Sequence, residues 1–199
     1  MRHNMEPIIA DKQKPMLQQT SLAELKKGSN GISPLRKVLF LDFDGVMVTD
    51  RHQGQLTAIG CPLRDRFGAK FDPVCVEFLK KIIDSTDAGI VVTSTWKMEM
   101  GLDGIQQMWH ARNLPGRVIG VTPDIDPIHR GNEIAAWLAV YSEECRYAII
   151  DDAPFADFFR QEQLEHLFCV DERTGIDGNT MQLVVEHLIG MGGNNGEKK

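Results

Sequence analysis

The chain has 199 residues, of which 42% are hydrophobic and 25% are charged, and its formal net charge at pH 7 is -6. This length supports one domain with a full hydrophobic core, and the composition is that of a soluble globular protein. The acidic balance disfavours bulk binding of nucleic acid, and no apolar run approaches the roughly 20 residues that cross a bilayer. A polar N-terminus and four scattered cysteines favour a reduced, cytoplasmic setting without a secretory signal or a membrane partner.

The two ends of the chain differ in composition from its centre. Residues 1–36 are polar and end in a stretch of Gly, Ser, Asn and Pro that is typical of a linker. Within them, residues 21–24 fit a capping box and predict one short helix. Residues 190–199 are rich in Gly, Asn and Lys, as in a disordered tail. The sequence thus predicts an N-terminal extension over 1–36, one domain over 37–189 and a tail over 190–199.

Within the central part, short apolar runs alternate with helical patterns. The runs are continuously apolar, as in strands that are covered on both faces of a parallel sheet. They lie at 38–41, 90–93, 118–121, 148–150 and 167–170. This alternation predicts a doubly wound α/β fold with a five-stranded parallel sheet and helices on both faces.

The clearest helical pattern follows Asp72, a predicted N-cap, and Pro73, which suits the first helical position. Apolar residues recur there at spacings of three, four and seven. They are Phe71, Val74, Cys75, Phe78, Leu79 and Ile82. Two further helices are expected over about 132–141 and 180–189.

Polar residues follow three of the predicted strands, and the carboxyl ends of parallel strands meet at one edge of a sheet. Carboxylates follow the first and fourth strands and hydroxyls follow the second. These residues are Asp42, Asp44, Thr93, Ser94, Asp151 and Asp152. Four carboxylates in one place raise one another's pKa unless a cation neutralises them. Because all are oxygen ligands and no His or Cys cluster competes, Mg²⁺ is the expected metal, with the four aspartates as its ligands.

This set of residues suits phosphoryl transfer. A carboxylate beside Mg²⁺ can attack phosphorus, and a second carboxylate can protonate the leaving oxygen and later activate water. Asp42 and Asp44 have the spacing for these two roles, and Gly45 permits a tight turn directly after them. The hydroxyl of Thr93 or Ser94 can hold a phosphate oxygen.

A cation is expected to match the charge of the phosphoryl group. Arg130 lies at the start of the helix before the fourth strand, although Lys97 is a rival and a surface role for Arg130 stays open. Either Asp151 or Asp152 can contact the metal directly, with Asp152 slightly favoured. Trp96 fits either a place at the mouth of the site or a packing role.

Residues 37–46 resemble motif I of the haloacid dehalogenase (HAD) superfamily, in which Asp-x-Asp-Gly-Val follows a hydrophobic strand. Residues 90–94 resemble motif II, Arg130 motif III and residues 148–152 motif IV. The resemblance covers residues 37–189. It implies a catalytic domain in which Asp42 is the nucleophile, forming an aspartyl-phosphate, and Asp44 is the acid and base. It also implies that Thr93 or Ser94 and Arg130 bind phosphate, and that Asp151 and Asp152 serve the metal.

A narrower likeness concerns residues 93–97, 130–134 and 170–175, which resemble the HAD domain of Swiss Army Knife RNA repair proteins. It makes a nucleic-acid end one candidate substrate. Residues 151–154 also resemble phosphatases of the C-terminal-domain type, which act on phosphopeptides.

Residues 46–70 form a polar flap too short for a cap domain, and the gap before Arg130 holds only one helix and one strand. Cap-less members of the superfamily act on large substrates or form a lid by oligomerising. A phosphoaspartate signalling module and a catalytically silent binding subunit are the alternatives to a phosphatase. The substrate, a small molecule or a macromolecule end, and the oligomeric state stay open.

Overall fold

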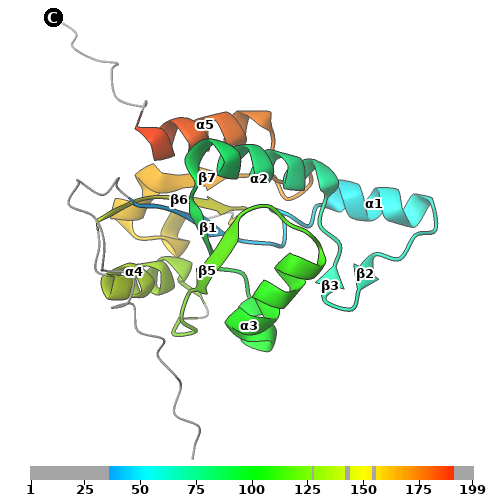
Figure 1. Ribbon diagram of the computed structural model, residues 1–199, viewed down its shortest axis with the longest axis horizontal. Coiled ribbons are helices and arrows are strands. Elements are labelled where there is room, and N and C mark those ends of the chain that lie inside the picture. The colour runs from blue at the N-terminus through cyan, green and yellow to red at the C-terminus, as the bar shows by residue number, and fades with distance from the viewer. Residues whose placement is uncertain (1–35, 127, 142–143, 154–155, 191–199) are drawn as a thin grey trace, which may run out of the picture. The chain divides into compact units, whose positions relative to one another are not determined.

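A computed structural model describes residues 36–126, 128–141, 144–153 and 156–190 of the chain (Figure 1). The helix predicted at 21–24 lies outside these residues, as do nearly all of the predicted extension and tail. Among the described residues, no helix is long and apolar enough to span a membrane.

The centre of the fold is a parallel five-stranded sheet in the order β5-β4-β1-β6-β7. Its strands are β1 (Arg36–Leu41), β4 (Gly89–Val92), β5 (Arg117–Val121), β6 (Cys145–Asp151) and β7 (Leu167–Cys169). Each overlaps a predicted strand, so the predicted α/β fold is confirmed. The chain builds outward from β1 to β5 and then crosses to β6 on the other side of β1. The carboxyl ends of β1 and β6 therefore flank the topological switch point, where such sheets bind ligands.

Helices cover both faces of this sheet. They are α2 (Pro73–Thr86), α3 (Trp96–Ala111), α4 (Arg130–Tyr141) and α5 (Gly178–Ile189). The predicted start of α2 is confirmed, because the Asp72 side chain accepts a hydrogen bond from the Val74 amide at 2.9 Å and Pro73 is the first helical residue. One residue of its predicted apolar face is misplaced, since Val74 is 45% exposed. Helices α4 and α5 each begin two residues before their predicted starts.

The core has two layers because alternate residues of a strand face opposite sides of a sheet. Leu39 and Leu41 pack with residues of α2, α3 and α5 in one cluster. Val38 and Phe40 pack with Ile134 of α4 in the other. In Figure 1, α2 and α5 lie together on one side of the sheet and α4 lies on the opposite side.

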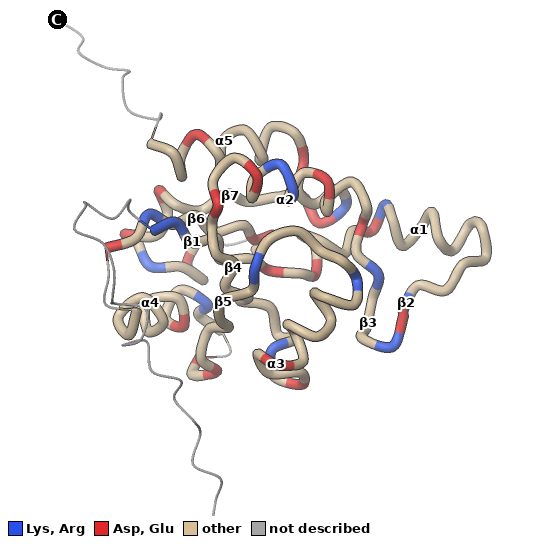
Figure 2. The backbone as a smooth tube through the Cα atoms, viewed as in Figure 1, with Lys and Arg blue, Asp and Glu red and all other residues tan. Residues whose placement is uncertain are grey.

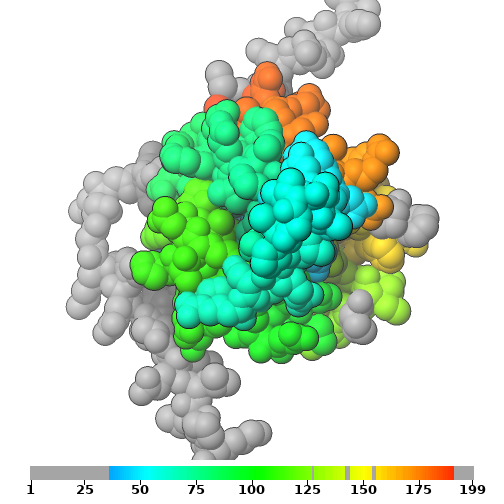
Figure 3. Space-filling view, turned by 90° about the vertical axis from the view of Figure 1, so that its right-hand side faces the viewer, coloured from blue at the N-terminus to red at the C-terminus, as the bar shows by residue number. Residues whose placement is uncertain are grey.

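The predicted polar flap is folded but small. It contains α1 (Asp50–Ala58) and a hairpin formed by β2 (Arg64–Asp65) and β3 (Gly68–Ala69). Helix α1 buries no residue and is capped by Thr49, whose side chain accepts a hydrogen bond from the His52 amide at 3.1 Å. These elements form the near surface of the molecule in Figure 3. The described chain has no large cap, as predicted.

Candidate active site

Backbone hydrogen bonds continue just beyond the ends of β1 and β4 and fix the residues that follow. The Asp42 amide donates to Ile150 O at 3.2 Å, and the Thr93 amide donates to Leu41 O at 3.0 Å. Asp151 is the last residue of β6, next to β1. The polar ends of three adjacent strands thus converge at one edge, as the sequence predicts.

Three carboxylates gather at this edge. Oxygen atoms of Asp42, Asp151 and Asp152 lie within 4.8 Å of one another, and the first two residues are almost fully buried. Burial, together with the charge of Asp42, raises the pKa of Asp151 to about 6, against the opposing effect of Arg130. Burial and the same charge also raise the pKa of Asp152. The cluster therefore has the mutual repulsion that a cation would relieve.

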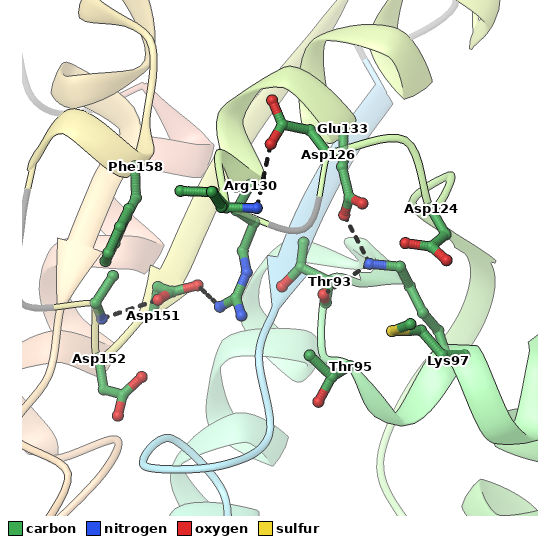
Figure 4. Close-up of a pocket in the computed structure, with 13 residues that line it drawn as sticks. Thr93, Thr95, Lys97, Asp124, Asp126, Arg130, Glu133, Asp151, Asp152 and Phe158 are labelled. Carbon is green, nitrogen blue, oxygen red and sulfur yellow. Dashed lines mark hydrogen bonds and ion pairs between the residues drawn. The ribbon is translucent and has the colours of Figure 1, made fainter.

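Arg130, the first residue of α4, faces this cluster. Its Nη1 atom donates to Asp42 Oδ2 at 2.7 Å. The same atom also donates to Asp151 Oδ2 (Figure 4). Burial disfavours the guanidinium charge, but the charges of Asp42 and Asp151 outweigh burial and raise the pKa of Arg130. A permanently charged group with several donors thus lies directly against the predicted nucleophile.

Lys97, the rival cation, is bound elsewhere. Its ammonium group lies 2.6 Å from Glu133 Oε2 and donates to Thr93 O at 3.2 Å, with both side chains less than a tenth exposed. Glu133 also accepts hydrogen bonds from Thr122 Oγ1 at 3.2 Å and from the Ile125 amide at 3.3 Å. Because Lys97 is held by Glu133 and Thr93, Arg130 is the cation closest to Asp42 of the two. No pattern in the sequence singles out Glu133 as a residue of the site.

The two predicted phosphate-binding hydroxyls have different surroundings. Thr93 Oγ1 and Ser94 Oγ are both buried without a hydrogen-bond partner among the described residues. Thr93 lines a cavity of about 470 Å³ together with Arg130, Asp151 and Asp152, whereas Ser94 is not part of its wall. A buried hydroxyl without a partner is costly, so an acceptor bound in the cavity would stabilise Thr93. Thr93 and Arg130 therefore offer hydrogen-bond donors to an anion bound in this cavity.

Asp44 lies apart from the three clustered carboxylates. Its side chain is exposed and accepts a hydrogen bond from Trp96 Nε1 at 3.0 Å. Neighbouring atoms still remove part of the water around its carboxylate, and this partial desolvation raises the pKa of Asp44 against the opposing effect of the Trp96 bond, while the charge of Asp42 adds to the increase. A metal contact from Asp44 stays a prediction. The sequence left open whether Trp96 lies at the mouth of the site or has a packing role. It does both, since it packs on Phe43 and also contacts Asp44.

Gly45 makes room for the acidic cluster. Its φ of +72° belongs to the left-handed region, and a Cβ atom there would lie 2.0 Å from Asp152 Oδ2. The Gly45 amide donates to Val48 O at 2.9 Å, which closes the turn after Asp44. Glycine is thus required both by the turn and by the approach of Asp152.

An acidic site at the carboxyl edge of a parallel sheet, without a large cap in the described chain, agrees with the HAD-type hydrolase that the sequence motifs predict. Over residues 38–180 the sequence matches the family described as the HAD domain in Swiss Army Knife RNA repair proteins, and the chain belongs to this family. Among solved structures, a haloacid dehalogenase-like hydrolase of Streptococcus pneumoniae is 14% identical with a TM-score of 0.42. That alignment covers 75% of this chain and 90% of the other. None of the curated proteins compared with the chain matches it.

Proposed function

We propose that the chain is a magnesium-dependent phosphomonoester hydrolase that forms an aspartyl-phosphate on Asp42. The observation that carries this proposal is the surroundings of Asp42. It is buried, it is hydrogen-bonded to Arg130, and it lies beside two further carboxylates. Thr93, whose hydroxyl has no hydrogen-bond partner among the described residues, lines the same cavity as Arg130.

The reaction has two steps. An Asp42 oxygen attacks phosphorus, and the bond between phosphorus and the leaving oxygen breaks while Asp44 gives that oxygen its proton. Water then attacks the phosphorus of the aspartyl-phosphate and gives a proton to Asp44, and inorganic phosphate and free Asp42 are formed. Thr93 and Arg130 hold the phosphoryl oxygens through both steps.

The carboxylates fit a hard divalent cation, because Asp42, Asp151 and Asp152 supply oxygen ligands at one place and no nitrogen or sulfur ligand joins them in the described chain. These residues would hold Mg²⁺, which when bound screens the repulsion between Asp42 and the phosphoryl group. Asp151 is already bound to Arg130, whereas Asp152 is only half-buried. Asp152 is therefore the more available ligand of that pair.

We further propose a large substrate, with a nucleic-acid end as the first candidate and a phosphopeptide as the second. Two observations support this proposal: no large cap covers the site in the described chain, and the matching family is named for RNA repair proteins. Basic and acidic residues are interspersed along the backbone (Figure 2), so specificity would come from contacts close to the site rather than from bulk charge. The four cysteines form no disulfide, which supports a reduced, cytoplasmic setting.

The test is phosphate release by the purified chain from p-nitrophenyl phosphate, nucleotides, oligonucleotide 3′- and 5′-phosphates and phosphopeptides. We expect Mg²⁺-dependent turnover that EDTA removes and that Asp42→Asn reduces to background. Asp84→Asn is the matched control, because Asp84 is an exposed residue of α2 whose only described ion pair is with Lys80. Labelled phosphate should remain on the quenched wild-type protein and not on Asp42→Asn. Full turnover by Asp42→Asn would refute the proposal.

A further inference from the structure

We infer that Trp96 is a positioning residue for Asp44, whose carboxylate it orients toward the leaving group of the substrate. The inference rests on the proposed function. The Trp96 indole nitrogen donates to Asp44 Oδ2 at 3.0 Å. Among the described residues this is the one hydrogen bond that the Asp44 carboxylate accepts. An exposed carboxylate would otherwise sample several rotamers, so the indole selects one of them.

The indole ring is itself held from several sides. It meets the Phe43 ring edge to face, with centroids 5.5 Å apart, and the Phe71 ring at 5.9 Å. Gly68 packs so closely against it that a Cβ atom at Gly68 would lie 2.8 Å from the ring. The guanidinium of Arg112 lies 5.8 Å from the ring centroid. With its ring fixed in this way, Trp96 can hold Asp44 in place.

The β2–β3 hairpin completes this support. Arg112 forms two hydrogen bonds with the Asp65 carboxylate, at 2.9 and 2.8 Å, and donates to Ala69 O at 3.0 Å. The hairpin is therefore bound to Arg112, the residue that follows α3, and Trp96 is the first residue of that helix, which is kinked at Gly101. The flap thus acts on the chemistry through a fixed contact between Gly68 and Trp96.

This arrangement has a consequence for the first chemical step. When one oxygen of Asp44 is held by Trp96, the other is free to carry the proton to the leaving oxygen as the bond to phosphorus breaks. General acid catalysis contributes about 10²- to 10⁴-fold to such a step. It matters most when the leaving group is a poor one, such as an alkoxide, and little when the leaving group is a stable phenolate.

The test compares Trp96→Phe with Trp109→Phe on two substrates, 2,4-dinitrophenyl phosphate and an alkyl phosphate, with Mg²⁺ present. Trp109 is the matched control because it belongs to the same aromatic cluster, but its indole donates to Pro115 O at 3.0 Å. The quantity measured is kcat/KM, which reports the step in which the leaving group departs. We expect Trp96→Phe to lose about 10- to 100-fold on the alkyl phosphate and far less on the aryl phosphate. Trp109→Phe should affect both substrates equally.

The inference would be overturned if Trp96→Phe lost kcat/KM equally on both substrates. It would also be overturned if the ratio of the losses on the alkyl and aryl phosphates were the same in Trp96→Phe as in Trp109→Phe. If Trp96→Phe does not fold, Gly68→Ala takes its place, because the added methyl group displaces the indole without removing it, and the same selective loss is expected. Gly68 has a φ of +135°, so Gly60→Ala is the control for backbone strain, because Gly60 has a φ of +68° and a Cβ atom added there would meet no other atom within 4 Å. The proposed function fails separately, if the wild-type chain releases no phosphate or Asp42→Asn retains full turnover. A wild-type enzyme that is active, together with a Trp96→Phe variant without selective loss, contradicts the role of Trp96 alone.

Discussion

Gly45, which follows Asp42 and Asp44, has no space beside it for a side chain. Gly45 combines a positive φ with the approach of the Asp152 carboxylate, so any side chain there meets both a backbone penalty and a clash. A left-handed conformation costs a non-glycine residue roughly 1–2 kcal/mol. The additional clash falls on a predicted metal ligand.

We therefore expect Gly45→Ala to lower phosphatase activity by at least about tenfold, because a misplacement of about 1 Å at a catalytic group can cost about 10²-fold. Gly54→Ala is the control, since Gly54 lies in α1, a Cβ atom added there would meet no other atom within 4 Å, and activity should stay unchanged. Steady-state kinetics of both variants against p-nitrophenyl phosphate measures the difference. Equal activity of the two variants would show that the position of Asp152 does not matter.

The sequence predicts site residues at the ends of strands, but it does not predict contacts between residues far apart in the chain. Asp42 and Thr93 directly follow buried strands and Asp151 is the last residue of one, so the pattern of the strands alone brings them to one edge. The bond between Trp96 and Asp44 joins residues 52 positions apart, and the Lys97–Glu133 pair spans 36 positions. No local pattern encodes such pairs, because they depend on how α3 and α4 pack. The sequence therefore predicted the residues of the four motifs and left open the choice between Arg130 and Lys97.

At the scale of elements, the buried pair of Lys97 and Glu133 connects α3 to α4. Breaking one partner of a buried ion pair costs roughly 3–5 kcal/mol, because the other charge is left without compensation. We expect Lys97→Met to lower the free energy of unfolding by about this amount, and Lys97→Met combined with Glu133→Leu to recover part of it. Urea unfolding measures both variants.

The control for that comparison is Lys80→Met, because Lys80 pairs with Asp84 on the exposed face of α2. An exposed pair of this kind contributes only about 0.2–1 kcal/mol. If the two single variants lose the same stability, the buried pair has no special role in joining the helices.

Asp72 connects the flap to α2 and gives a prediction for pH. Its carboxylate accepts hydrogen bonds from Thr49 Oγ1 at 2.7 Å, Arg51 at 2.8 Å and the Val74 amide at 2.9 Å. Burial acts to raise the pKa of Asp72, but these bonds outweigh burial and lower it. The stabilisation is therefore present above the ordinary pKa of about 3.9 and is lost as the pH falls through the lower pKa of the folded state.

We expect Asp72→Asn to be less stable than wild type at pH 7, and the difference to narrow as the pH falls below about 4. Losing the helix cap alone costs about 1 kcal/mol. Thermal melting of both proteins between pH 7 and pH 3 measures this difference in stability. If the difference in stability stays constant or increases toward low pH, the Asp72 carboxylate does not stabilise the fold through its lowered pKa.

The elements that the sequence missed share a physical reason. Helix α1 buries no residue, so it has no apolar face from which a period could be recognised. Each strand of the hairpin has only two residues. The hairpin is supported by hydrogen bonds from Arg112 to Asp65 and Ala69, which lie more than 40 positions before Arg112 in the chain. The five strands and α2 were predictable because burial imposes a period on them, whereas the flap depends on contacts that a local pattern does not contain.

At the scale of the whole molecule, the acidic cluster should couple metal binding to folding. Asp42 repels Asp151 and Asp152 in the folded chain and moves away from them on unfolding, so a cation that binds all three stabilises the folded state alone. At a Mg²⁺ concentration 100-fold above Kd the gain is about 2.7 kcal/mol. A domain of this size then melts roughly 5–10 °C higher.

Asp152→Asn separates metal binding from other effects of Mg²⁺ on the chain. It removes one of the repelling charges, so without metal the variant should be at least as stable as wild type. It also removes a ligand, so the increase in Tm with Mg²⁺ should shrink. The two effects have opposite signs, and a general effect of salt on stability predicts neither. Melting curves of wild type and Asp152→Asn, each with EDTA and with Mg²⁺, give the four Tm values that this comparison needs. If both proteins gain equally from Mg²⁺, the cation does not bind at Asp152, and the metal site of the proposed phosphatase would need other ligands.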